Sequence, residues 1–156
     1  MLLADYIIDH QNIDWGTILA DWAWLLPEEL TVWLMNCYGD LFLIFDDGSI
    51  HLLDVGAGTI ERLADDKDDF CQKIDEGNNA NQWLMIPLVD RLVEAGNLLS
   101  EGCCYSFVIS PVLGGQYSVE NTATLSIVEH YSLYASIHQQ IEDLPNGTTV
   151  KLTVQN

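Results

Sequence analysis

The residues best suited to chemistry lie in one stretch, LGGQYSVEN, at residues 113–121. Gly114 and Gly115 can adopt a positive φ without a steric penalty, and Asn121 is one of the few other residues that tolerate it. If this loop lines a pocket, Glu120 is a candidate general base. Turn chemistry favours another interpretation, in which Glu120 and Asn121 stabilise the loop by hydrogen bonds.

The sequence patterns of common catalytic and cofactor sites are absent. Gly114-Gly115 lacks the further glycine or lysine of a phosphate-binding loop, and no G-x-S-x-G elbow occurs. The four histidines are scattered, without an H-E-x-x-H motif or a Cys/His cluster. Asp46, Asp47 and Asp54 lack the spacing of an EF-hand, and turn formation explains the first two. We therefore predict no catalytic, cofactor-binding or metal-binding residues, and a protein that is not an enzyme.

Carboxylates are the dominant chemical groups of this chain. Its 24 acidic and 5 basic residues give a formal net charge of -19, and residues 1–61 contain no Lys or Arg. Such a surface repels nucleic acid and attracts a basic partner, whose association a one-signed field can accelerate by roughly 10 to 10³-fold. Acidity that serves solubility alone is the alternative.

Eight carboxylates at predicted turns and helix starts are our candidates for a partner-binding surface. They are Glu28, Glu29, Asp46, Asp47, Asp65, Asp66, Asp68 and Asp69.

Length, N-terminus and cysteines indicate one compact unit in the cytoplasm. A chain of 156 residues that is 49% hydrophobic can bury a full core. The start MLLADYIIDHQN has no basic region and is interrupted by Asp5 and Asp9, so it is not a signal peptide. No apolar run approaches the roughly 20 residues that cross a bilayer, and the four cysteines lack C-x-x-C spacing. We expect reduced thiols and no membrane partner.

Hydrophobic spacing predicts two N-terminal helices. Residues 13–26 place apolar side chains on one helical stripe, and Pro27 suits the first turn of a second helix that ends at Gly39. The second helix would bury Leu30, Trp33, Leu34 and Cys37. We interpret the four tryptophans of this pair as core residues rather than a binding stripe.

The rest of the chain predicts an α+β domain with a mainly antiparallel sheet. A meander is expected over residues 41–45, 50–55 and 59–63, with Asp47-Gly48 in its first turn. Helices follow at 65–76 and 87–95, separated by a loop at 77–82. Strands are expected at 103–110 and 122–130, then a helix capped by Ser132, a turn at 145–147 and a strand at 148–154. Residues 1–26 form a tail and first helix, and residues 27–156 form the domain.

Four blocks of sequence, taken in order, resemble the C-terminal domain of type VI secretion immunity proteins, formerly a domain of unknown function. They are YGDLFLIFDDGSIHLLDVGAGTIERLA, Trp83 with LVDRLVEAG, SPVLGGQYSVEN, and SIHQQIEDLPNGT. The similarity extends over about residues 27–154, and the order of the blocks is more specific than any single block. The resemblance makes Gly114, Gly115, Tyr117, Glu120 and Asn121 a signature loop of the family.

The founding member of that family neutralises a DNase effector, so the resemblance implies a non-catalytic inhibitor of a toxin. A nuclease must present a cationic groove to phosphates, and a carboxylate-rich surface can cover such a groove. We predict a cytoplasmic protein that occludes a basic toxin, a nuclease effector, and that needs no cofactor. The oligomeric state is left open.

Two other functions stand beside this prediction. The first is a small-ligand-binding protein or enzyme whose pocket at residues 113–121 uses Tyr117, Glu120 and Asn121. A deep pocket that holds Glu120 would favour it. The second is an unpaired relative of the family with a housekeeping interaction.

Overall fold

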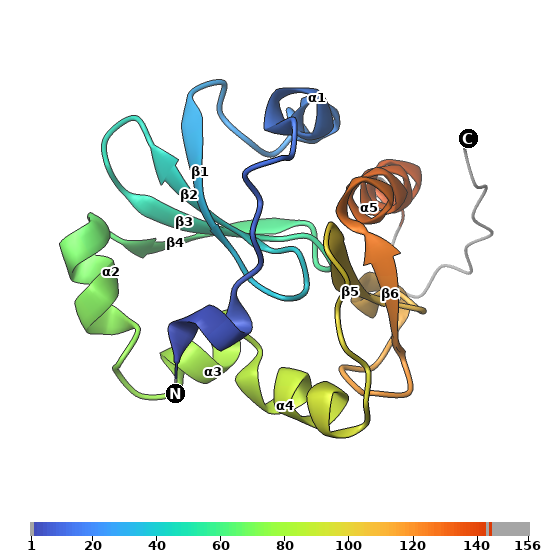
Figure 1. Ribbon diagram of the computed structural model, residues 1–156. Helices are drawn as coiled ribbons and strands as arrows, with labels where there is room; N and C mark the ends of the chain where they lie inside the picture. Colours follow the sequence, from blue (N-terminus) through green and yellow to red (C-terminus); the bar gives the residue numbers. More distant parts are fainter. Residues whose placement is uncertain (1, 143, 145–156) are drawn as a thin grey trace.

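A four-stranded antiparallel sheet forms the framework of the protein, of which the computed structural model describes residues 2–142 and 144 (Figure 1). Strands β1 (Leu30–Met35), β2 (Leu41–Phe45), β3 (Ile50–Asp54) and β4 (Thr59–Ala64) are neighbours in this order. The predicted meander over β2, β3 and β4 is confirmed. Its first turn contains Gly48 at φ 86°, whose N–H donates to the Phe45 carbonyl at 2.9 Å.

The prediction of a second N-terminal helix is wrong, because the residues that follow Pro27 form β1. Leu30 pairs with Phe45 and Met35 with Leu41, and the register shifts between Val32 and Leu34. Both faces of β1 are covered, so its apolar residues form a nearly continuous run instead of an alternating one. That run, together with the irregular register, imitates the spacing of a helix.

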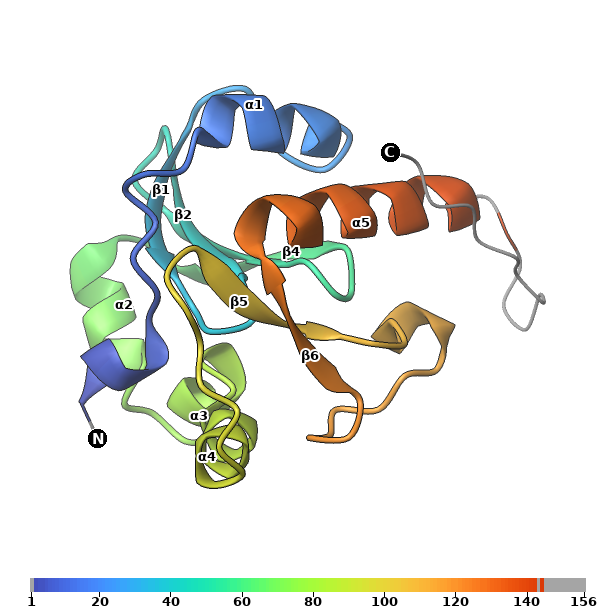
Figure 2. The same ribbon diagram turned by 45° about the vertical axis from the view of Figure 1, so that its right-hand side comes forward.

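Helices cover both faces of this sheet (Figures 1 and 2). On one face lie α1 (Trp15–Leu19), a 3-10 turn at Ala20–Trp22, and α5 (Ile127–Ile141). The predicted helix over 13–26 is therefore shorter than expected, since α1 ends at Leu19. The rings of Trp15 and Trp22 lie 5.3 and 5.9 Å from that of Tyr131 in α5, so these two tryptophans pack in the core as predicted. Trp24 is an exception, because it is 51% exposed.

The opposite face is covered by α2 (Lys67–Lys73) and α3 (Asn79–Trp83), which precede α4 (Ile86–Glu94). The predicted helices at 65–76 and 87–95 are confirmed by α2 and α4. The predicted loop at 77–82 is wrong over residues 79–82, because α3 begins at Asn79. Trp83 of α3 is buried and stacks on Phe70 of α2 at 5.4 Å, so burial of the tryptophan overrides the polar composition of the segment.

A second, two-stranded sheet consists of β5 (Cys103–Phe107) and β6 (Thr122–Ser126), and α5 follows directly. The predictions of a strand to residue 130 and a cap at Ser132 are wrong. Ser126 caps the helix, because its hydroxyl accepts a hydrogen bond from the Glu129 N–H at 3.1 Å. Short 3-10 turns lie at Leu3–Tyr6 and Pro111–Leu113. The predicted turn at 145–147 and strand at 148–154 lie outside the described residues.

Candidate partner-binding surface

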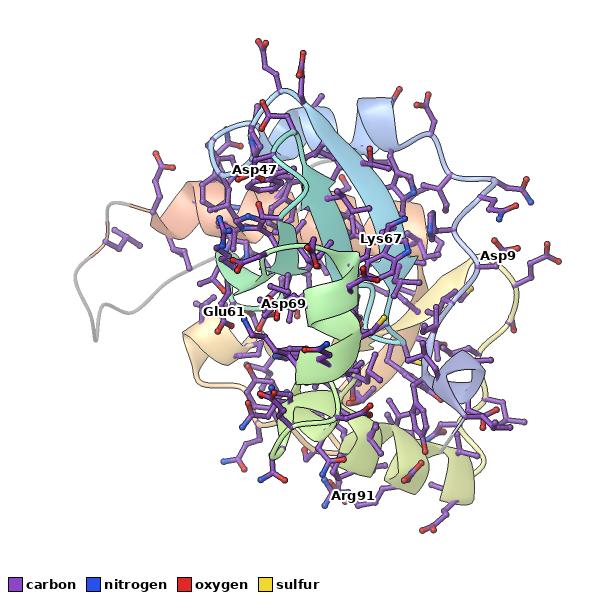
Figure 3. All side chains as sticks on the ribbon, turned by 90° about the vertical axis from the view of Figure 1, so that its left-hand side faces the viewer. Asp9, Asp47, Glu61, Lys67, Asp69 and Arg91 are labelled. Carbon is purple, nitrogen blue, oxygen red and sulfur yellow. The ribbon has the colours of Figure 1, made fainter. Side chains whose placement is uncertain are left out.

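The strand register brings all eight candidate carboxylates to one end of the four-stranded sheet. Residues 28–29 precede β1 and residues 46–47 follow β2, and the facing ends of these strands pair through Leu30 and Phe45. Residues 65–69 follow β4, whose last residue, Ala64, pairs with the first residue of β3. Figure 3 shows Asp47 in the hairpin turn and Asp69 on α2 on the same side of the molecule. Three segments that are distant in sequence thus form one acidic end, residues 28–29, 46–47 and 65–69.

Four carboxylates of the acidic end have partners within the chain: Asp47, Asp65, Asp66 and Asp69. Arg62 on β4 lies 2.9 Å from the Asp65 carboxylate and 3.7 Å from that of Asp47. Lys73 lies 2.9 Å from Asp69, whose carboxylate also accepts the Asp65 N–H. Asp66 caps α2 by accepting the Asp69 N–H. Hydrogen bonds from Ser49 lower the pKa of Asp47. These four side chains therefore stabilise the turn and the helix start.

The other four carboxylates are exposed and make no hydrogen bond or ion pair within residues 2–142: Glu28, Glu29, Asp46 and Asp68. Among the described residues, three basic side chains lie at this end, and two of them, Arg62 and Lys73, are already paired. The third, Lys67, lies over the Trp33 ring at 5.3 Å from its centroid. With eight carboxylates against three cations, the acidic end keeps an excess of negative charge.

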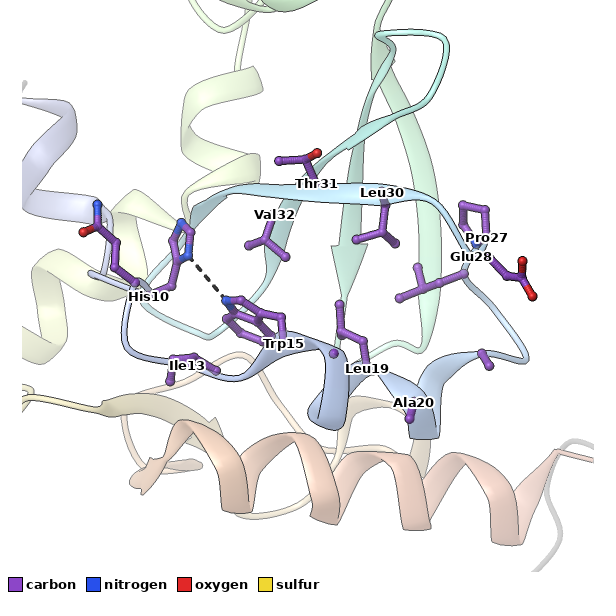
Figure 4. Close-up of a pocket in the computed structure, with 14 residues that line it drawn as sticks. His10, Ile13, Trp15, Leu19, Ala20, Pro27, Glu28, Leu30, Thr31 and Val32 are labelled. Carbon is purple, nitrogen blue, oxygen red and sulfur yellow. Dashed lines mark hydrogen bonds between the residues drawn. The ribbon is translucent and has the colours of Figure 1, made fainter.

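A cavity of about 830 Å³ lies between β1 and α1, next to the acidic end (Figure 4). Leu30 and Val32 point into it from β1, Trp15 and Leu19 face them from α1, and Glu28 lies at one end. No pattern in the sequence predicts this cavity, because it exists only if residues 30–35 form a strand.

The loop at 113–121 is held together by its own polar groups and does not line that cavity. The Asn121 amide accepts the Ile109 N–H at 2.9 Å and donates to the carbonyls of Ile109 and Gln116 at 2.9 and 2.8 Å. Gly114 has φ 91°, as expected for a turn glycine. The exposed Glu120 makes no hydrogen bond within the described residues, so Asn121 alone has the predicted stabilising role.

Tyr117, the aromatic residue of this loop, packs its ring edge-to-face against Phe107 at 5.0 Å and is 54% exposed. Tyr117, like Asn121, thus contacts residues close to the loop.

Two serine–histidine pairs have the separation of a nucleophile and its base, but both serines are buried. Ser49 Oγ lies 2.9 Å from His51 Nε2, and Ser106 Oγ lies 2.9 Å from His130 Nδ1. Each serine is 1% exposed, so a substrate has no access to either hydroxyl in this structure. Burial also lowers the pKa of His130 to about 4, which keeps this imidazole neutral. Both pairs thus have the character of structural contacts.

A metal-ligand cluster and a membrane-spanning helix are both absent from the described part of the chain. Residues 2–142 contain no group of three or more His, Cys, Asp or Glu side chains that could hold a metal ion. None of their helices combines the length and apolarity needed to cross a bilayer. All four cysteine thiols are free.

Residues 64–138 match the family model described as "T6SS immunity protein Tdi1, C-terminal". The resemblance to type VI secretion immunity proteins is confirmed over these residues. The matched segment of this immunity family begins at the last residue of β4 and ends in α5. It includes the carboxylates at 65–69 and the 113–121 loop, whereas those at 28–29 and 46–47 precede it.

One solved structure similar to this chain is described as "Crystal structure of Atu4351 from Agrobacterium tumefaciens". It has a TM-score of 0.51 and 15% sequence identity, and the match covers 77% of this chain. The match spans only 63% of that other chain, and at this identity it shows a shared fold alone. No curated protein sequence matches.

Proposed function

We propose that this chain is a non-catalytic immunity protein that binds a basic toxin, a nuclease effector, and covers its phosphate-binding surface. The observation that carries the proposal is the convergence of three acidic segments on one end of the sheet. The match to an immunity family supplies the class of partner. The net charge of -19 gives the complementarity that such a partner requires.

The four unpaired carboxylates are the best candidates for contacts with the toxin. Glu28, Glu29, Asp46 and Asp68 offer negative charge with which no cation of the described residues pairs. A nuclease groove lined by Lys and Arg is built to bind a row of phosphates, and these carboxylates would take the place of the phosphates. Inhibition then requires occupancy alone, and no chemical step in the inhibitor. We place this encounter in the cytoplasm, where the nucleic acid to be protected lies.

Charge reversal of the acidic end tests this proposal. Toxin and immunity genes of the family that this chain resembles usually lie side by side, so the product of the adjacent gene is the candidate toxin. The triple variant Glu28→Lys, Glu29→Lys, Asp46→Lys should lose protection of cells that express this product. A matched control reverses Glu94, Glu101 and Glu142, which are also exposed but lie on α4, on the α4–β5 loop and just after α5. Both variants change the net charge by the same amount, so total charge cannot explain a difference.

The control variant should protect cells and co-purify with the toxin as the wild type does. Equal loss of protection in both variants would mean that the total negative charge, and not the acidic end, attracts the toxin. Full protection by the variant reversed at 28, 29 and 46 would refute the proposed surface. A wild-type protein that neither binds the adjacent gene's product nor protects against it would refute the immunity function.

A further inference from the structure

Half of the outer strand β1 has an unpaired edge. The N-terminal segment covers the second half, where the Ile8 N–H donates to the Met35 carbonyl at 2.8 Å and His10 Nε2 lies 3.1 Å from the Trp33 carbonyl. At residues 30–32, no backbone hydrogen bond joins the outer edge of β1 to another described segment. This stretch is about 10 Å long at roughly 3.3 Å per residue, enough for three or four residues of an added strand.

The cavity between β1 and α1 lies beside this open edge (Figure 4). Leu30, Val32, Trp15 and Leu19 give it a mainly apolar lining, and its volume of about 830 Å³ falls within the range of roughly 300–1,000 Å³ typical of ligand sites. An open strand edge beside an apolar pocket is the arrangement used in strand addition. The backbone edge supplies hydrogen bonds, and the pocket accepts alternate side chains of the added segment.

We propose that an extended segment of the toxin adds to β1 at residues 30–32 and inserts an apolar side chain into the cavity. This inference rests on the proposed function and names the chemistry of the contact. Glu28, at the end of the cavity, receives a Lys or Arg of the same segment. The groove is continuous with the acidic end, so one partner surface covers both.

Charge complementarity identifies the occupant as a basic segment. Residues 2–29 contain six carboxylates and no Lys or Arg. A second copy of this chain would bring an equally acidic segment to the groove, and the carboxylates next to the strand edge oppose such self-pairing. A segment in which Lys or Arg alternates with apolar residues can pair with Glu28 at the end of the cavity and also fill its apolar interior.

Gly16→Trp blocks the groove with little risk to the fold. Gly16 lies on α1 and lines the cavity, and a Cβ there would meet only Asp14 Oδ1, at an ordinary 3.5 Å. Removing a glycine from a helix also favours the helix. The matched control is Gln82→Trp, which adds the same side chain at an exposed position on α3.

The experiment measures binding of each variant to the purified, catalytically inactivated toxin from the adjacent gene, together with amide exchange of wild-type β1. Gly16→Trp should weaken binding on the order of tenfold or more, and Gln82→Trp should leave it nearly unchanged. The toxin should slow exchange of the amides at residues 30–32. Melting curves of both variants verify that they are folded.

The possible failures are distinguishable. Wild-type affinity in Gly16→Trp, or no protection of residues 30–32, refutes strand addition even if charge reversal at the acidic end abolishes binding. A wild-type dimer that Gly16→Trp dissociates would assign the groove to a second copy and refute the inference. No binding by the wild type refutes the proposed function, and the inference with it.

Discussion

Replacing Gly115 by alanine should destabilise the protein much more than the same change at the adjacent Gly114. A Cβ at Gly115 would lie 1.7 Å from the Ile109 carbonyl oxygen and 3.0 Å from Asn121 Nδ2. That carbonyl must therefore move by more than 1 Å, roughly the shortfall from the closest real Cβ contacts near 3.0 Å. The shift would break both hydrogen bonds between Asn121 and the Ile109 backbone, and the one from the Gly115 N–H to Ser110. At about 1 kcal/mol each, the free energy of unfolding falls by about 3 kcal/mol.

Gly114 is the control, because its constraint is conformational only. Its φ of 91° costs a non-glycine residue about 1–2 kcal/mol, no atom lies within 4 Å of the added Cβ, and alanine recovers part of the cost by restricting the unfolded chain. The net loss should be about 1 kcal/mol. Urea denaturation followed by tryptophan fluorescence measures both values, since Trp22 is fully buried. Equal losses in the two variants would refute the close approach of residues 109 and 115.

The same variant separates a structural loop from a ligand site. Under conditions where Gly115→Ala is folded, it should bind the toxin like the wild type, because the loop lies outside the acidic end. Loss of toxin binding in the folded variant would indicate that the 113–121 loop contributes to the binding site.

Three further predictions concern capping, pH and salt. Ser126→Ala should lower the free energy of unfolding by about 1 kcal/mol in thermal melting, and Ser132→Ala, which removes no cap, should change it little. Burial, and next the negative charge of Asp54, raise the pKa of Asp40 well above its usual range, so the folded state binds the proton more tightly than the unfolded chain. The contribution of Asp40 to stability should therefore fall as pH rises above about 4. The melting temperature of the wild type should accordingly decrease with rising pH relative to that of Asp40→Asn. A relative increase would contradict a buried site that favours the protonated carboxyl. Association with the toxin should slow as salt rises from about 0.05 to 0.5 M, and a rate independent of salt would exclude electrostatic steering.

The meander and α4 were predictable because local signals define them. Asp47-Gly48 specifies a hairpin turn, and Pro87 in the first turn of α4 and Gly96 just after the helix mark its two ends. Ser126 and Glu129 also form a capping-box pattern, which correctly marks the start of α5, although the alternation of the preceding residues suggested a longer strand. Two local signals, the alternation of a strand and the cap of a helix, meet at this point, and the alternation does not show where the strand ends.

The acidic end was predictable only in part. Antiparallel hairpins return the chain to the same end of a sheet, so the meander alone brings residues 46–47 close to 65–69. Residues 28–29 join them only because β1 pairs with β2, and helical spacing concealed that strand. The cavity depends on the same pairing, so no local pattern could reveal it.

The two faces of the four-stranded sheet have a consequence for truncation. The matched segment, residues 64–138, contains α2, α3, α4 and most of α5, but it lacks α1, strands β1, β2 and β3, and all of β4 except Ala64. In α2, Phe70 packs against Trp33 and Phe42 with ring separations of 5.0 and 5.5 Å, and Tyr131 of α5 packs against Trp15. Excised alone, the segment would expose these aromatic rings to water, so it is a recognisable stretch of sequence but not an autonomous folding unit. A shortened version of the protein must therefore keep the N-terminal region through β3, although the family match begins after it.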